Sequence, residues 1–260
     1  MKNKLLLVVL SALGLGVTGA GAQTAASAPA PSWVVTPAFV SQYMFRGVRL
    51  GGPSFQPTVE YDRGPWVGGL WANFPMADKV PGQSNPEFDL YGSYTETVSD
   101  SLNFASGFTL YYYPEAEKNN GFYRYTFEPS VTVNYTISGL KLSPKFCYDL
   151  VLNGPTLELG AAYAIPLKAV GTELDFTGTI GTYKWARAAE DTVPDVKNYG
   201  NYWLLGVSAP FQVTANSKLI LGWAYTRGTA NYLKQGSAPK VLNPGAVGRG
   251  VASVSYSLTF

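Results

Sequence analysis

The chain ends with the stretch SVSYSLTF (253–260), in which small polar residues alternate with apolar ones up to a final aromatic residue. Such alternation is typical of a β-strand with one apolar and one polar face. The apolar face comprises Val254, Tyr256, Leu258 and Phe260. A last strand whose backbone faces lipid needs a neighbour on both sides, and a sheet closed into a barrel provides one.

The same period of two recurs along the rest of the chain. In TLELGAAYAIPL (156–167) and KLILGWAY (218–225), large apolar residues occupy every second position, with mostly small or polar residues between them. We count about twelve such segments, mostly longer than a usual globular strand and of the length that crosses a bilayer at a tilt. They lie near residues 33–47, 54–62, 66–76, 87–98, 101–113, 122–135, 140–152, 156–167, 172–185, 199–211, 217–227 and 249–260.

The lengths of the connections between these segments alternate. Every second connection is short: 62–65, 99–100, 136–139, 168–171 and 213–216. The others are mostly long: 47–53, 77–86, 114–121, 186–198 and 228–248, with 153–155 as the short exception. Outer-membrane barrels combine short periplasmic turns with longer extracellular loops. We therefore predict an all-β protein, a closed antiparallel transmembrane β-barrel of about twelve strands in the bacterial outer membrane.

The N-terminal residues predict a signal peptide over 1–22. MKNK is basic, LLLVVLSALGLGV is apolar, and Ala20-Gly21-Ala22 resembles a cleavage site. A membrane anchor is the alternative, but the apolar run is short for a spanning helix. Residues 23–31 then form a flexible leader, and the barrel occupies 32–260.

The composition excludes several classes of function. Without residues 1–22, Lys plus Arg falls from 19 to 17 against 17 acidic residues, so no basic face for nucleic acid is expected. The chain has no histidine, which excludes Ser-His pairs and histidine-based zinc sites. Cys147 is the single cysteine, so an internal disulfide is excluded. No motif predicts a cofactor or a metal site.

Two prolines, Pro129 and Pro144, fall inside the predicted strands 122–135 and 140–152. Proline cannot donate a hydrogen bond to a sheet. We expect a bulge or a local break where these two neighbouring strands meet.

Aromatic residues gather near the predicted strand ends. Examples are Trp66, Tyr125, Trp185, Tyr202 and Trp203. Rings at such positions are expected to form girdles at the membrane interfaces, although aromatic residues also favour strands in general.

Three stretches, SQYMFRG (41–47), GGLWAN (68–73) and EFDLYGSY (87–94), resemble the TorF-like porin family of proteobacterial outer membranes. The residues that match its motifs are Ser41, Tyr43, Phe45, Arg46 and Gly47, and then Asp89, Leu90, Tyr91, Gly92 and Tyr94. The resemblance covers about the first third of the chain and implies a barrel and a channel without indicating a solute. The end of the chain resembles the C-terminal signal read by the barrel-assembly machinery, carried here by Tyr256, Leu258 and Phe260.

Charged residues on the predicted strands should face the lumen, because Arg or Lys on the lipid face near the midplane costs about 2–4 kcal/mol. The residues predicted to line the pore are Arg46, Glu60, Glu87, Asp89, Arg124, Glu128, Lys141, Lys145, Asp149, Glu158, Glu173 and Asp175.

These charges have two interpretations. Those on three adjacent strands, between Arg124 and Glu158, form either a constriction of mixed sign or a salt-bridge network that fills the lumen. Arg46 is expected to point inward as a structural clamp held by Glu60, Glu87 or Asp89, or else to contact solute. The loop 228–248 either folds inward or stays on the surface.

The favoured function is a porin-like channel for passive diffusion of small polar or ionic solutes. The alternatives are a structural or adhesive barrel with a closed lumen and, least favoured, an outer-membrane enzyme. Membrane lipid is the expected surrounding. The sequence leaves ion preference and oligomeric state open.

Overall fold

The computed structural model describes residues 31–78, 86–116, 123–187, 196–235 and 237–260. The predicted signal peptide and nearly all of the leader lie outside these residues. None of the described helices is long and apolar enough to cross a membrane. The elements are β1 (Ser32–Thr36), β2 (Ala38–Val40), β3 (Tyr43–Phe45), β4 (Val48–Gly51), β5 (Ser54–Phe55), β6 (Thr58–Arg63), β7 (Trp66–Pro75), β8 (Glu87–Ser99), β9 (Leu102–Tyr112), β10 (Tyr125–Ile137), β11 (Leu140–Asp149), β12 (Gly154–Leu167), the short 3₁₀ helix η3 (Lys168–Val170), β13 (Thr172–Trp185), β14 (Val196–Thr214), β15 (Ser217–Gln235), β16 (Val241–Leu242) and β17 (Arg249–Thr259).

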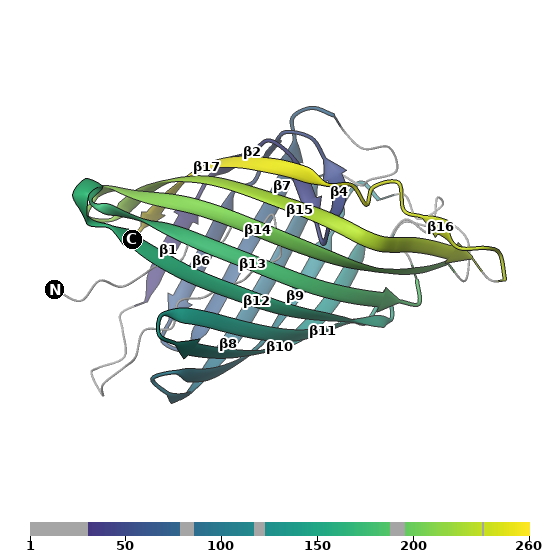
Figure 1. Ribbon diagram of the computed structural model, residues 1–260, viewed down its shortest axis with the longest axis horizontal. Helices are drawn as coiled ribbons and strands as arrows, with labels where there is room; N and C mark the ends of the chain where they lie inside the picture. The colour runs from purple at the N-terminus through teal and green to yellow at the C-terminus, as the bar shows by residue number, and fades with distance from the viewer. Residues whose placement is uncertain (1–30, 79–85, 117–122, 188–195, 236) are drawn as a thin grey trace.

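The sheet closes on itself as an antiparallel barrel (Figure 1). The last strand, β17, pairs with β15 on one side and with β1 and β2 on the other. Since β1 with β2 and β5 with β6 each make one strand of the wall, the barrel has twelve strands. The predicted fold and strand number are confirmed. The terminal stretch therefore pairs on both sides, as a strand exposed to lipid must.

The two faces of the wall differ in polarity. On β12, Leu157 and Leu159 are 53% and 44% exposed on the outside, while Glu158 between them is 8% exposed inside. On β17, Val254 faces outward and Ser257 is buried, as the alternation predicts. An apolar outer band of this kind is what lipid covers in a membrane barrel.

The end of β17 and the turn between β14 and β15 lie at the same end of the barrel, where Thr259 N donates to the Asn216 carbonyl at 2.9 Å (Figure 1). β14 and β15 are each 19 residues long and form a hairpin joined by this turn. At the other end of the barrel both strands extend past the end of β13. The predicted loop 228–248 is therefore half strand, and β16 pairs back onto β15.

The two prolines lie where the β10–β11 ladder is interrupted. At Pro129 the ladder stops, and its last pair is Ser130 with Cys147. Near Pro144 the ladder has a gap between the pair of Thr132 with Lys145 and the pair of Tyr135 with Leu142. The register is the same on both sides of the gap. The predicted local break is confirmed, and no bulge forms.

The first predicted strand, 33–47, is wrong beyond Val40. The chain leaves the wall at Ser41, and β3 and β4 form a separate two-stranded sheet that pairs only with itself. It returns to the wall at Ser54, which is the Cα partner of Val40. The connection forms a hairpin that projects into the barrel, since Arg46 at its turn contacts Glu128 on β10 and Glu158 on β12.

Candidate functional site: an arginine hairpin inside the lumen

The β3–β4 hairpin turns through Arg46 and Gly47. Both have positive φ angles, 48° and 75°, which are typical of a type I′ turn. Glycine adopts this conformation freely, but for Arg46 it costs about 1–3 kcal/mol and persists only where other contacts fix the residue.

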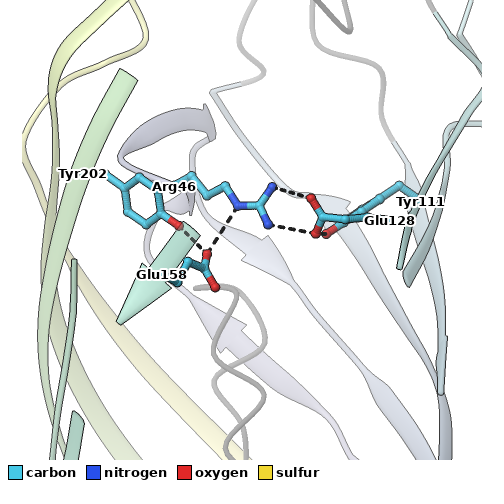
Figure 2. Close-up of polar contacts among 5 residues, drawn as sticks. All are labelled: Arg46, Tyr111, Glu128, Glu158 and Tyr202. Atoms are coloured by element: carbon cyan, nitrogen blue, oxygen red, sulfur yellow. Dashed lines mark hydrogen bonds and ion pairs between the residues drawn. The ribbon is translucent and has the colours of Figure 1, made fainter. Parts of the chain in front are cut away.

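Arg46 is fixed by two carboxylates on the wall half-way round the barrel (Figure 2). Its Nη1 and Nη2 atoms donate to the two oxygens of Glu128, both at 2.8 Å, and its Nε donates to Glu158 at 3.4 Å. A bidentate pair of this kind is the strongest geometry for arginine and carboxylate. Because Glu128 lies on β10 and Glu158 on β12, Arg46 connects the first wall strand to the far side.

Each carboxylate also accepts a hydrogen bond from a tyrosine. The Tyr111 hydroxyl donates to Glu128 at 3.3 Å, and the Tyr202 hydroxyl donates to Glu158 (Figure 2). These bonds help to satisfy charged groups that are almost completely shielded from water.

The lumen leaves space for the Tyr202 ring because the strand between the tyrosine and its acceptor carries glycine. Glu158, Gly181 and Tyr202 are Cα partners across β12, β13 and β14. A Cβ atom on Gly181 would lie 2.3 Å from the Tyr202 ring. Glu60, Gly69 and Tyr91 repeat the arrangement on β6, β7 and β8, with Tyr91 donating to Glu60 at 2.5 Å.

Aromatic rings surround the guanidinium of Arg46. Its central carbon lies 4.7 Å from the ring centroid of Phe45 and 5.7 Å from that of Trp185. Trp185, Tyr183, Tyr202 and Leu152 form a buried cluster against which Phe45 packs. The prediction that Trp185 and Tyr202 belong to the outer girdles is therefore wrong.

Tyr43, at the start of the hairpin, contacts a different part of the wall, at β8. Its hydroxyl donates to Glu87 at 2.7 Å, and Tyr113 donates to the other oxygen of Glu87 at 3.1 Å. Its ring lies 5.7 Å from that of Trp71. All three stretches of sequence that carry the family resemblance, 41–47, 68–73 and 87–94, therefore meet inside the barrel.

Backbone contacts hold the tip of the hairpin against β15. Gly228 N donates to the Gly47 carbonyl at 2.9 Å, and a Cβ atom on Gly47 would lie 2.4 Å from Gly228 N. Arg49 N donates to the Gly245 carbonyl at 2.7 Å. The segment that folds inward is therefore 41–53, and the loop after β15 contacts it.

Most of the predicted pore-lining residues face the lumen, but they do not form one ring. Asp89, Glu128, Lys145, Asp149 and Glu158 lie toward the long-loop end, where Asp149 accepts backbone hydrogen bonds from Val151 and Leu152 at 2.8 and 2.7 Å. The remaining ones, toward the short-turn end or midway along the wall, are Glu60, Lys141, Glu173 and Asp175.

Two placements differ from the prediction. Arg124 is exposed at the long-loop end, where its Nε donates to the Ala116 carbonyl at 3.1 Å, so it does not belong to the constriction. Arg46 pairs with Glu128 and Glu158 because the hairpin carries it across the lumen, away from the predicted partners Glu60, Glu87 and Asp89.

Lys145 contributes a second positive charge near these carboxylates. It is the Cα partner of Glu158 and interacts electrostatically with both Glu128 and Glu158. No ion pair of Lys145 occurs among the described residues, whereas Arg46 has two.

Sequence reasoning missed the aromatic and glycine residues of the site. They are Tyr43, Phe45, Gly47, Tyr111, Tyr113, Gly181, Trp185, Tyr202 and Gly228. One signal was available: Arg46-Gly47 separates two short alternating stretches, and a glycine at the second turn position favours a type I′ hairpin. Among the described residues, no group of His, Cys, Asp and Glu could hold a metal ion.

The fold defines a class, the closed twelve-stranded β-barrel with an apolar exterior and a polar, occupied lumen. Among solved structures, the NanC porin is similar, with a TM-score of 0.50 and 11% identity over 87% of this chain and 98% of that chain. The KdgM porin is similar with a TM-score of 0.51 and 10% identity over 87% and 99% of the two chains. At these identities the similarity establishes the fold.

The chain belongs to the Gcw_chp family, described as bacterial protein of unknown function, whose model matches residues 23–234. A search of curated proteins gives no match.

Proposed function

We propose that the protein is a channel of the bacterial outer membrane through which small polar or ionic solutes diffuse passively. The β3–β4 hairpin narrows this channel near its long-loop end. Solutes enter between the long loops, pass the hairpin and leave at the short turns, driven by their concentration gradient alone.

The observation that carries the proposal is the opposite polarity of the two faces of a closed wall. The exterior is apolar, while the interior carries carboxylates and lysines along the whole wall, as at Lys141 and Asp175 near the short turns and Glu128 near the long loops. Twelve strands lie between the eight that side chains fill and the sixteen that leave a wide aqueous channel. A lumen of this intermediate size is sensitive to what one loop places in it.

Single-channel recording tests the proposal. The chain 23–260 is refolded and inserted into a planar bilayer under a salt gradient, beside a variant in which 41–53 is replaced by Asn-Gly. Because Val40 and Ser54 are Cα partners in the wall, a two-residue turn joins them without disturbing the barrel.

We expect discrete current steps from the wild type and larger steps from the shortened variant. Silence from both proteins, each shown to be folded by heat-modifiable electrophoretic mobility, would contradict a channel function.

A structural or adhesive barrel is the second candidate, and the pinning of the hairpin by Arg46 favours it. If the hairpin closes the lumen completely, the wild type gives no current while the shortened variant conducts. An outer-membrane enzyme is the least favoured alternative, because the chain lacks histidine and no nucleophile stands beside the lumen carboxylates in the sequence.

The proposed function also implies two partners, membrane lipid and the barrel-assembly machinery. The apolar exterior contacts membrane lipid, and the barrel-assembly machinery reads the terminal residues Tyr256, Leu258 and Phe260 during insertion. The resemblance of SQYMFRG (41–47) to the TorF-like porin family also supports a channel.

A further inference from the structure

The outer face of the barrel is basic at the long-loop end of β13, β14 and β15. On β13, Tyr183 and Trp185 point inward, so Lys184 between them points outward. The cross-strand partners of Lys184 on β14 and β15 point outward as well, and so does every second residue from them toward the long loops. The basic residues of this patch are Lys184, Lys197, Arg227, Lys234 and Lys240. Within the described part of the chain no acidic residue shares this surface. Glu190, Asp191 and Asp195 lie in the segment 188–195, outside the described residues.

Two of these lysines face each other. Lys197 and Lys234 are Cα partners on β14 and β15. Like charges in directly opposite positions destabilise a strand pair. A neutralising anion outside the chain would convert this repulsion into attraction.

Aromatic rings support the patch. Tyr199 and Tyr232, the next outward-facing Cα partners, have ring centroids 5.6 Å apart, and the Lys240 Nζ lies 4.2 Å from the Tyr232 ring centroid. The cation–π contact holds Lys240 beside the paired lysines. Lys184, Lys197, Lys234 and Lys240 therefore lie around the same pair of tyrosine rings.

The position of the patch along the barrel indicates its partner. Arg227 is opposite Trp203, whose ring lies 5.4 Å from that of Tyr225, and Ile180 beside Trp203 is exposed on the outer face. Such aromatic side chains mark the membrane interface. Arg227 therefore lies at headgroup level, and Lys197 and Lys234 lie six and seven residues further out along β14 and β15.

We propose that this patch binds the phosphate groups of lipopolysaccharide in the outer leaflet. Clustered lysines and arginines beside the hydrocarbon region recognise anionic headgroups, and their hydrogen bonds to phosphate are charge-assisted. The inference rests on the proposed outer-membrane location, with the long loops outside the cell.

The test compares Lys197→Gln/Lys234→Gln with Arg63→Gln/Lys168→Gln, which removes the same charge from exposed positions at the short-turn end. Thermal unfolding of each refolded chain is followed in detergent, alone and with added bisphosphorylated lipid A. Without lipid A, the Lys197/Lys234 variant should unfold at or above the wild-type temperature, because the repulsion is removed. With lipid A, the wild type and the Arg63/Lys168 control should be stabilised, and lipid A should bind the Lys197/Lys234 variant about 10- to 30-fold more weakly.

Two results would overturn the proposal: equal stabilisation of both variants by lipid A, or equal stabilisation of the wild type by dephosphorylated lipid A. Inorganic phosphate serves as a third ligand, and a stabilisation as large as that by lipid A would assign the site to free phosphate instead. Conductance in bilayers of phosphatidylcholine is measured separately, so a failure of the channel proposal is distinguishable from a failure here.

Discussion

Arg46 shows how a single side chain can decide what a lumen contains. A buried ion pair is weak evidence for stability, since desolvation opposes the attraction between the charges. Its value here is positional: the bidentate contact with Glu128 has a single productive geometry, which fixes the tip of the hairpin. The residue therefore acts as a positional anchor for the hairpin.

Removal of one partner should release the hairpin. In Glu128→Gln, Arg46 loses its bidentate carboxylate, and breaking such a buried pair costs about 3–5 kcal/mol. We expect the hairpin to swing out and to become sensitive to trypsin after Arg46 and Arg49, as detected by mass spectrometry of the digested barrel.

Glu173→Gln is the matched control, because Glu173 is a lumen carboxylate with no contact to the hairpin among the described residues. Protection of Arg46 in both variants would show that Glu128 does not hold the hairpin.

The glycines beneath the tyrosines allow a comparison of adjacent positions. Gly69→Ala places a Cβ atom 2.4 Å from the Tyr91 ring, whereas Gly68→Ala meets only a carbonyl oxygen at 3.9 Å. Overpacking of this kind costs about 1–3 kcal/mol. We expect Gly69→Ala to lower the free energy of unfolding in urea titrations in lipid vesicles and Gly68→Ala to leave it unchanged. Equal effects would mean that the ring moves aside freely.

For single residues, the sequence predicts which side chains point inward better than it predicts which side chains they contact. Inward placement of Glu128, Glu158 and Asp149 follows from alternation alone, and the structure agrees. The partner of Arg46 depends on a chain reversal that joins residues 82 and 112 positions apart, which no local pattern reports.

Among the elements, β17 closes the barrel. Trp33 and Phe260 exchange two backbone hydrogen bonds, of 3.2 and 2.9 Å, at the last residue of the chain. The Phe260 side chain itself is 72% exposed and takes no part in these bonds. The proposed role of its aromatic ring as an assembly signal can therefore be tested without breaking these bonds.

Phe260→Ala keeps the backbone bonds and removes the ring. We expect this variant to refold in detergent as efficiently as the wild type but to reach the outer membrane of cells in clearly lower amount, measured by membrane fractionation. Equal amounts in cells would argue against a signal role. A loss in refolding as well would assign the ring to stability.

The predicted strands are correct where the chain stays in the barrel wall. The prediction is wrong where the chain leaves the wall but remains extended. Residues 33–47 are predicted as one strand, but the part after Val40 forms a hairpin, because an extended segment has the same period of two whatever it pairs with. The β15 strand extends to Gln235, past the predicted end at 227, since Gly228 and Ala230 were interpreted as loop.

The two ends of the whole molecule differ in the lengths of their connections, and the proposed orientation places the long connections outside the cell. An epitope tag inserted after Lys240 should be bound by antibody on intact cells, and the same tag after Val170 only after permeabilisation. Labelling in the reverse pattern would invert the proposed orientation. Labelling of neither site in permeabilised cells would indicate that the tagged chains do not assemble.

Closure and strand number were predictable for the whole molecule because short and long connections alternate and an even number of strands follows. The content of the lumen was not, since a loop of ordinary length and composition, 47–53 with the residues before it, gives no signal of turning inward. Its destination is fixed by contacts with β10, β12 and β15 that exist only after the wall has formed.

The hairpin leaves the wall at the seam where the ring is sealed, because β2 is the neighbour of β17. Ser41 N bonds to the Ala252 carbonyl, so the hairpin base and the final strand meet directly. Because β17 supplies both the partner strand of β2 and the acceptor for Ser41, the base of the hairpin is complete only once the ring is sealed. Filling of the lumen and completion of the wall are therefore coupled in biogenesis.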